Sequence, residues 1–502
     1  HLPNLKVVDL SFSTKLVRTP DFDGLPCLER LVLKNCTSLK EIHPSIGYHE
    51  RLIFLDMKNC SSLELFPPIF RMKKLETLIL SHCDNLCKIP EIQTGMDNLV
   101  KFSLRGTCIE IVPSSVGQYC NNLVSLDLRW CGHLRSIEGN FHLLKHLQLL
   151  YLDGCDQLKN IPTEGLFGVE CCLNVLSLSS YILQPGAVNE FLGFRRFLRR
   201  LSLRRCNLVD EGISSVFWEE LSNLEVLDLS NNGFSRLPSS LSQLSHLKFI
   251  NLFGCYNLVD LPDLPSSISI LIADGCRSLK IGDFPTNHLK WLWKVILPPS
   301  NHNGERVLQS MLQGNAIEDY FISIVFEECC VPIRGFARGT FLLQLTWNWY
   351  NEFCGFLIYI GRSNWYGEEV IVIKDVLGME NGDGVLEVSN KPDHHDDDED
   401  GMTAAKGMCY ISFGSLRNTS WWNSTHTTLS FSLQTESNFK VELVRGRNQG
   451  DDSILKDTTY LSNFWDEEFQ NQKTFEIISD SKSSIQILWD TRSIGSDLFD
   501  RI

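Results

Sequence analysis

This 502-residue sequence lacks several features by which an enzyme or a membrane protein would be recognised. It contains no stretch of about 18 uncharged apolar residues, which a membrane-spanning helix requires. It also contains no glycine-rich phosphate loop, no nucleophile elbow and no H-E-x-x-H metal motif. We therefore expect no membrane span, no catalytic site, and no metal or organic cofactor.

An excess of basic residues is missing as well, because the formal net charge is −15. This acidity argues against nucleic acid as a bulk partner. The charge is uneven: residues 1–289 hold 28 Lys and Arg against 30 Asp and Glu, whereas residues 290–502 hold 18 against 31. The shift indicates two regions of different construction, with a boundary near residue 290.

The 18 cysteines form no recognisable disulfide or zinc framework. Eight recur once per repeat, as described below. The other ten, Cys87 and Cys108 among them, show neither capping pairs nor C-x-x-C spacing. Since no export signal precedes the first repeat, we expect a reducing compartment, namely the cytoplasm, with the nucleus as a further location.

What the sequence does contain is a leucine pattern, L-x-x-L-x-L-x-x-C-x-x-L, seen clearly at residues 28–39. The pattern returns at residues 147–158 and, with isoleucine at one position, at residues 247–258. Twelve apolar anchors between Leu5 and Ile268 begin units that are 21 to 26 residues long. A period in this range predicts a leucine-rich-repeat solenoid.

One further position of each unit predicts how the turns are held together. The last two leucines of L-x-x-L-x-L point to the same side of a short strand, and stacked units bury them as one column. Three residues later, a small side chain can lie inside the turn and satisfy backbone groups. We expect the thiols at this position to be buried and reduced. These ladder positions hold Cys36, Cys60, Cys83, Thr107, Cys131, Cys155, Cys206, Asn232, Cys255 and Cys276.

The residues between and directly after the strand leucines should point away from the core, onto the concave face of the solenoid. In units two to six a basic ridge runs there beside a partly acidic one. Arginine and aromatic anchors are typical of protein-binding surfaces. The alternative is a solvated face whose charges pair between neighbouring strands. The candidate binding residues are Lys34, Asp56, Lys58, Arg105, Asp127, Arg129, Tyr151, Arg204 and Phe253.

The rest of the chain predicts a second domain. Residues 286–316 read as a cap and connector that covers the open end of the solenoid. Short apolar runs separated by turn residues then predict strands, without helices between them. The acidic run at residues 393–400 predicts a solvated loop rather than a metal site, and His426 a strand-edge residue rather than a catalytic one. The expected strands are residues 321–326, 341–345, 353–360, 370–373, 408–413, 428–433, 439–444, 475–478 and 485–488.

We therefore predict an α/β leucine-rich-repeat solenoid, with a parallel sheet on its concave face, over residues 1–285. An antiparallel all-β sandwich or jelly roll follows at residues 317–490, and residues 491–502 form a tail.

Several phrases carry a resemblance to a known family. Among them are L-P-N-L-K-V-V-D-L-S at residues 2–11, I-H-P-S-I-G at residues 42–47 and L-P-D-L-P-S-S-I at residues 261–268. They resemble the repeats of plant intracellular immune receptors of the TIR-NBS-LRR class. F-C-G-F at residues 353–356 is similar to the F-x-G-F strand of that family's C-terminal jelly-roll or Ig-like domain, as is S-T-H-T at residues 424–427 to its S-x-H-T segment.

One element departs from the family. P-I-R-G-F at residues 332–336 stands where the family has P-x-W-F, before the first long strand of the C-terminal domain.

The resemblance implies a recognition function. In full-length members, the repeats and the jelly-roll domain recognise a pathogen effector or a guarded host protein. Recognition releases autoinhibition involving the receptor's own NB-ARC and TIR domains, and assembled TIR domains cleave NAD. Those two modules are absent from these residues, so the resemblance implies neither an ATP site nor NAD cleavage here. The alternative is a stand-alone cytosolic scaffold for host proteins; an extracellular receptor would need a signal peptide, disulfide caps and a membrane span.

Overall fold

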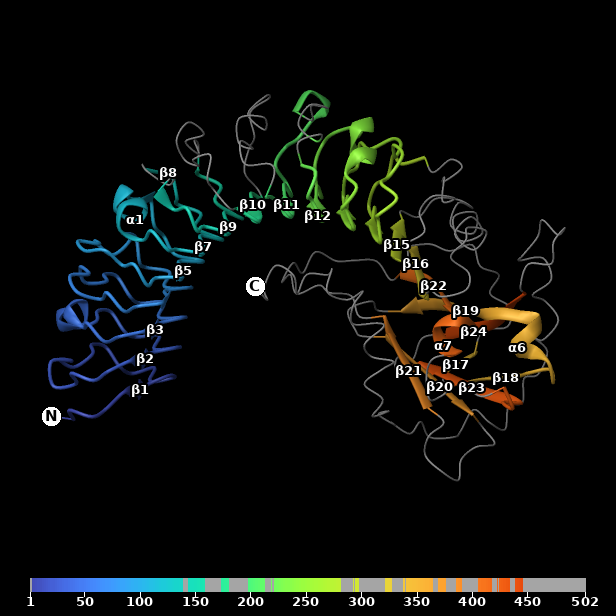
Figure 1. Cartoon of the computed structure of the whole chain (residues 1–502), viewed down its shortest axis with the longest axis horizontal. Helices are drawn as coiled ribbons and strands as arrows, with labels where there is room; N and C mark the ends of the chain where they lie inside the picture. Colours follow the sequence, from blue (N-terminus) through green and yellow to red (C-terminus); the bar gives the residue numbers. More distant parts are fainter. Residues whose placement is uncertain are drawn as a thin grey trace. The chain divides into compact units, whose positions relative to one another are not determined.

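The structure is a computed structural model that divides into two compact units, which we call unit one (His1–His246) and unit two (Leu247–Ile502). The single turns of the solenoid are called repeats from here on. Each unit is described by itself (Figure 1). The described residues are 2–138, 143–158, 173–179, 197–212, 218, 221–280, 292, 294–297, 321–326, 337–338, 340–363, 369–375, 385–390, 405–417, 422, 424–433 and 438–445.

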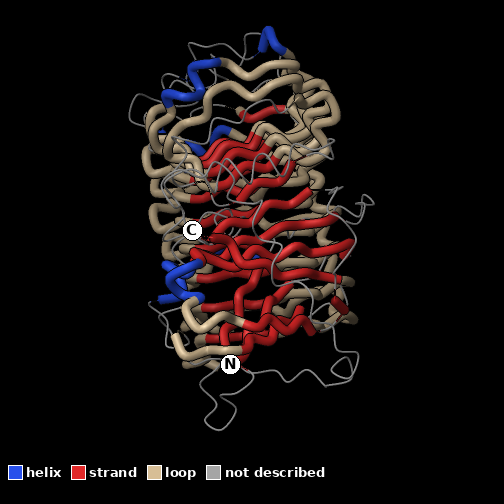
Figure 2. The backbone as a smooth tube through the Cα atoms, turned by 90° about the vertical axis from the view of Figure 1, so that its right-hand side faces the viewer, coloured by secondary structure: helices blue, strands red, loops and turns tan. Residues whose placement is uncertain are grey.

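Unit one is a stack of repeats with one short strand per turn. Each strand begins two residues after its apolar anchor and pairs in parallel with the next, so that Leu31 lies opposite Leu55 and Leu78 opposite Phe102. Figure 2 shows the strands running side by side, with loops along the edges. The strands are β1 (Val7–Asp9), β2 (Arg30–Val32), β3 (Phe54–Asp56), β4 (Thr77–Ile79), β5 (Lys101–Ser103), β7 (Ser125–Asp127), β9 (Leu149–Tyr151), β10 (Val175–Ser177), β11 (Arg200–Ser202) and β12 (Val226–Asp228).

The ladder side chains lie inside the turns and meet the backbone of the preceding repeat. Cys36 donates its thiol hydrogen to the carbonyl oxygen of Leu10 at 3.2 Å, and Cys131 repeats the contact with Leu104 at 3.2 Å. The eight ladder cysteines are buried, and none of them is disulfide-bonded. Asn232 does more, because its amide nitrogen donates to the carbonyls of Leu203 and Leu229, each at 2.8 Å.

The residue before each ladder position adopts a left-handed backbone. Its φ is 57° at Asn35, 61° at Trp130 and 67° at Gly154. Asparagine and glycine tolerate this conformation, whereas a bulky residue such as tryptophan is strained there. At Gly154 the preceding repeat also needs the space, because a Cβ atom would lie 2.5 Å from Cε3 of Trp130.

The return side of unit one holds short elements and a feature that the sequence reasoning excluded. Cys87 and Cys108, which we expected to be unpaired, form a disulfide. They are 21 residues apart, about one repeat, so consecutive turns bring them together. The short elements are η1 (Pro44–Tyr48), α1 (Ser114–Tyr119), η3 (Asp210–Gly212) and η4 (Ser239–Gln243), with β6 (Ile111–Val112) paired in parallel to β8 (Ser136–Ile137).

Unit two begins with parallel strands and continues into antiparallel ones within the same sheet. Strands β13, β14, β15 and β16 pair in parallel, and β16 then pairs antiparallel with β22. Strand β19 lies between β22 and β24, and β24 also pairs with β17. These strands are β13 (Phe249–Asn251), β14 (Ile270–Ile272), β15 (Lys294–Leu297), β16 (Phe321–Phe326), β17 (Ala337–Arg338), β19 (Phe353–Ser363), β22 (Ala405–Ser412) and β24 (Asn438–Arg445).

A second antiparallel sheet in unit two has the strand order β18-β23-β20-β21. Side chains from both sheets form one aromatic core around Trp349, which is fully buried. Its ring lies 5.0 Å from that of Phe413, and its indole nitrogen donates to the carbonyl of His426 at 3.1 Å. The elements are β18 (Thr340–Gln344), β20 (Glu369–Asp375), β21 (Val385–Asn390), β23 (Thr428–Leu433), α6 (Trp349–Glu352) and α7 (Phe413–Arg417).

Gly355 in the F-C-G-F segment has a packing reason. A Cβ atom there would lie 2.5 Å from both the ring of Tyr410 and the carbonyl oxygen of Ile411. Only glycine leaves room for the Tyr410 ring beside the strand at this point.

The predicted fold class is confirmed, since parallel repeats are followed by antiparallel sheets. Strands β15, β17 and β21 were not predicted, and β15 lies inside the segment expected to be a cap and connector. The acidic run and the strands expected at residues 475–478 and 485–488 fall outside the described residues. The domain limits at residues 285 and 317 stay a prediction.

Candidate protein-binding face

The strands of unit one present two side chains per turn opposite the core, and the residue after the last leucine adds a third. We call this surface, in repeats two to six, the strand face. Its predicted binding residues include the basic Lys34, Lys58, Arg105 and Arg129 and the acidic Asp56 and Asp127, and the first strand position adds the basic Arg30 and Lys101. The structure shows that these charges are not equivalent.

Lys34 and Asp56 form an ion pair between neighbouring repeats. The ammonium of Lys34 lies 3.2 Å from Oδ2 of Asp56, whose side chain is 3% exposed. Oδ1 of Asp56 also accepts the backbone N–H of Lys58 at 3.0 Å. Both carboxylate oxygens are therefore engaged inside the repeat stack, and Asp56 is a structural residue.

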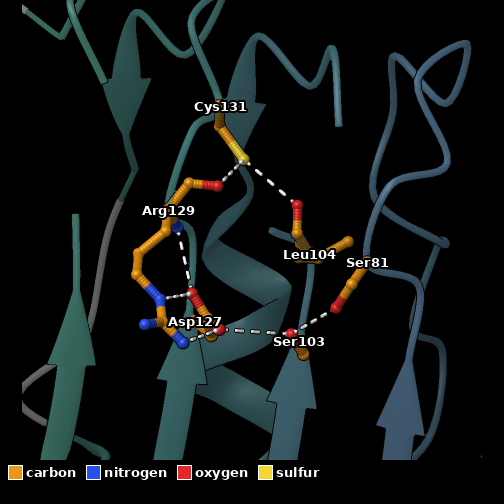
Figure 3. Close-up of polar contacts among 6 residues, drawn as sticks. All are labelled: Ser81, Ser103, Leu104, Asp127, Arg129 and Cys131. Carbon is orange, nitrogen blue, oxygen red and sulfur yellow. Dashed lines mark hydrogen bonds and ion pairs between the residues drawn. The ribbon is translucent and has the colours of Figure 1, made fainter. Parts of the chain in front are cut away.

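Arg129 and Asp127 form a closed pair within one repeat (Figure 3). The guanidinium donates from Nε to Oδ1 at 3.0 Å and from Nη2 to Oδ2 at 2.9 Å. Ser103 extends the pair by donating to Oδ2 at 3.5 Å, and its hydroxyl also lies 2.7 Å from that of Ser81. The guanidinium is 4.7 Å from the ring centroid of Tyr151. This arrangement holds Arg129 against the sheet.

Three residues expected at the surface are buried. Asp56 is 2%, Asp127 7% and Tyr151 5% exposed. Strand alternation correctly predicted that these side chains point away from the core. It did not predict their burial, because neighbouring repeats pack against them. Trp130 is 51% exposed and is the accessible aromatic residue beside this pair.

Lys58 and Arg105 differ from Lys34 and Arg129. Within the described part of the chain, neither makes an ion pair. Lys58 is exposed, whereas Arg105 is half-buried and its Nε has no hydrogen-bond partner. Arg204 and Phe253, the other two candidates, are half-buried; Phe253 belongs to unit two.

The first residues of successive strands form a separate column of side chains, which the sequence analysis did not predict. In the later turns of unit one, this column becomes apolar and buried at Leu149, Val175 and Val226. Arg200 stands in register between Val175 and Val226, with Nη1 lacking a partner, and burial lowers its pKa. The switch from Arg30 and Lys101 to these residues was visible in the sequence.

Asp153, which follows β9, is half-buried. Burial raises the pKa of Asp153, and hydrogen bonds from Ser177 and Ser179 oppose the shift. The hydroxyl of Ser177 donates to this carboxyl group.

The described residues give no support to metal binding or to a membrane span. No group of three His, Cys, Asp or Glu side chains in this part of the chain could hold a metal ion. No helix in the described ranges has the length and apolar character that a membrane crossing requires. His426 is buried, and its backbone carbonyl accepts a hydrogen bond from the indole nitrogen of Trp349.

Residues 222–266 match the family described as Leucine Rich repeats (2 copies). The chain is 36% identical over 266 residues to the TMV resistance protein N of Nicotiana glutinosa, covering 49% of this chain and 23% of that protein. It is 33% identical over 166 residues to the disease resistance protein RPS6 of Arabidopsis thaliana, covering 33% of this chain and 14% of that one. The predicted resemblance to plant disease resistance proteins is thus confirmed over the repeats.

The chain spans less than a quarter of the length of these relatives. Among solved structures, a leucine-rich-repeat protein of Leptospira interrogans aligns with a TM-score of 0.34 at 18% identity, covering 61% of this chain and 93% of that one.

Proposed function

Because its repeats are related to those of plant disease resistance proteins, we propose that this chain is the recognition part of a plant intracellular immune receptor. It binds a pathogen effector or a guarded host protein, and in a full receptor it contributes to autoinhibition. It acts by binding and not by catalysis. This proposal rests on the similarity to resistance proteins over the repeats.

The strand face of repeats two to six is the binding surface in this proposal. It offers the exposed Lys58, the half-buried Arg105 and the exposed Trp130 within a few turns. Arginine and tryptophan are enriched among the residues that contribute most to protein–protein affinity. The antiparallel sheets of unit two assist recognition. We place the chain in the cytoplasm, with the nucleus as an alternative.

A bulky residue on the strand face tests this proposal without depending on charge. Thr77 is half-buried on β4, and Thr77→Trp would obstruct the approach of a partner. Lys74→Trp, on the exposed turn just before β4, is the matched control. In a receptor that carries its N-terminal modules, Thr77→Trp should abolish the cell-death response and Lys74→Trp should leave it intact. An unchanged response in both, at unchanged melting temperature, would move the binding surface elsewhere.

The alternative function is a stand-alone scaffold for host proteins. It predicts stable complexes with host proteins in uninfected tissue, without a cell-death response in any assembled receptor.

A further inference from the structure

Lys58 and Arg105 on the strand face have no carboxylate partner among the described residues, although the face contains carboxylates. Asp56 is occupied by Lys34, and Asp127 by Arg129. Lys58 and Arg105 make no ion pair with any described residue. A buried guanidinium N–H without an acceptor is unfavourable, and Nε of Arg105 is in this state. An acceptor supplied from outside would relieve it.

The two cations flank one turn of the stack. Lys58 follows β3 and Arg105 follows β5, with β4 between them, so their backbones are separated by two strand spacings, roughly 10 Å. Ser81 and His82 occupy the intervening turn, and the backbone N–H of His82 donates to the carbonyl of Arg105 at 2.6 Å.

The field of both cations reaches this intervening turn. The pKa of His82 is lowered, chiefly by burial and then by the charges of Arg105 and Lys58. Asp84 and Asp127 act in the opposite direction but have the smaller influence. A positive potential therefore remains uncompensated at this point of the face.

We propose that Lys58 and Arg105 form a site for the carboxylates of an acidic protein segment, which lies across β4 with its charged groups over Ser81 and His82. This inference rests on the proposed function and names the chemistry of the partner. The guanidinium fork suits a carboxylate, and the ammonium adds a point charge. Ile79, half-buried at the end of β4, gives the segment an apolar contact.

A nucleic-acid partner fits this site less well. The chain carries a net charge of −15, and two isolated cations do not follow the closely spaced phosphates of a strand. The partner is therefore a protein with exposed Asp or Glu beside apolar residues.

The test compares two double charge reversals in the full chain. Lys58→Glu with Arg105→Glu changes the site, and Lys73→Glu with Lys74→Glu makes the same change of charge on an exposed loop. The probe is a fluorescein-labelled peptide of repeated Glu-Glu-Leu, titrated by fluorescence anisotropy at two salt concentrations. Inorganic phosphate and a thymidine oligonucleotide of equal charge serve as competitors. Circular dichroism melting verifies that both variants remain folded.

We expect the site variant to bind the peptide at least about tenfold more weakly than wild type, with the control variant within about twofold. The wild-type affinity should fall as salt rises. Absence of peptide binding by wild type, equal losses in both variants, or stronger binding of the oligonucleotide would each contradict the inference. If the peptide result fails while Thr77→Trp still abolishes the receptor's response, the proposed function stands and only the acidic partner is wrong.

Discussion

The ladder and the strand face both recur with every turn over repeats two to six, yet they differ in chemistry. In the sixth repeat, Arg129 of the strand face and Cys131 of the ladder are two residues apart (Figure 3). The ladder residue contacts the equivalent backbone carbonyl of the preceding repeat in turn after turn, so one small side chain fits nearly every repeat. The strand-face residue meets other side chains, so its partner changes from turn to turn. Uniform backbone partners therefore give uniform residues, and side-chain partners do not.

The largest predicted effect breaks the ladder where it departs from cysteine. Asn232→Ala leaves the carbonyls of Leu203 and Leu229 and the N–H of Leu208 without this partner in a buried turn. We expect a loss of about 3–6 kcal/mol in the free energy of unfolding, measured by urea denaturation. Cys60→Ala removes one weak thiol hydrogen bond and should cost about 2 kcal/mol or less. Equal losses would show that the asparagine has no special role in the ladder.

The second prediction separates paired from unpaired cations on the strand face. Arg129→Glu sets a carboxylate against the nearly buried Asp127 and should destabilise the fold by about 3 kcal/mol. Lys58→Glu, on an exposed residue without an ion pair among the described residues, should change stability by about 0.5 kcal/mol or less. Thermal melts of the two variants check this, and similar losses would mean that the Asp127 pair is not structural.

The two columns also differ in how far the sequence could predict them. The ladder and the repeat strands follow from local spacing, and the structure gives a strand at each of the twelve anchors. Burial of Asp127 and Tyr151 depends on the side chains one turn away, which no local pattern contains. The cross-repeat disulfide of Cys87 and Cys108 was missed because the two cysteines occupy different positions in their repeats. The separation of about one repeat was the available indication.

The third prediction concerns the left-handed residues that stand between the two columns. Gly154→Ala places a methyl group against the ring of Trp130 at a φ of 67°, and should cost about 1–2 kcal/mol. Trp130→Gly removes the ring but not the backbone strain at residue 154. Gly154→Ala should therefore cost less stability in the Trp130→Gly background than in the wild-type protein. Additive losses in this double-mutant cycle would show that the ring and the turn do not interact.

The smallest predicted effect is a pH dependence of the ladder alone. Burial raises the pKa of Cys131 from its ordinary 9.0 to about 11. The folded state then holds its proton longer than the unfolded chain, so stability is complete below about pH 9 and falls as the pH rises toward 11. One such thiol contributes about 1.4 kcal/mol per pH unit in that window. Urea denaturation at pH 8 and pH 10 should show a smaller loss in Cys131→Ala than in wild type; identical losses would exclude this thiol as the cause.

The pairing of β14 with β15, of β15 with β16 and of β16 with β22 bears on where the chain can be cut. The repeat sheet of unit two does not stop at β14, because its outer row of N–H and C=O groups is taken up by β15. Ending the chain before Lys294 would uncover that row as an exposed edge, a template onto which another chain can add. A fragment trimmed to the leucine periodicity should therefore self-associate, whereas one that retains these strands keeps its edge covered.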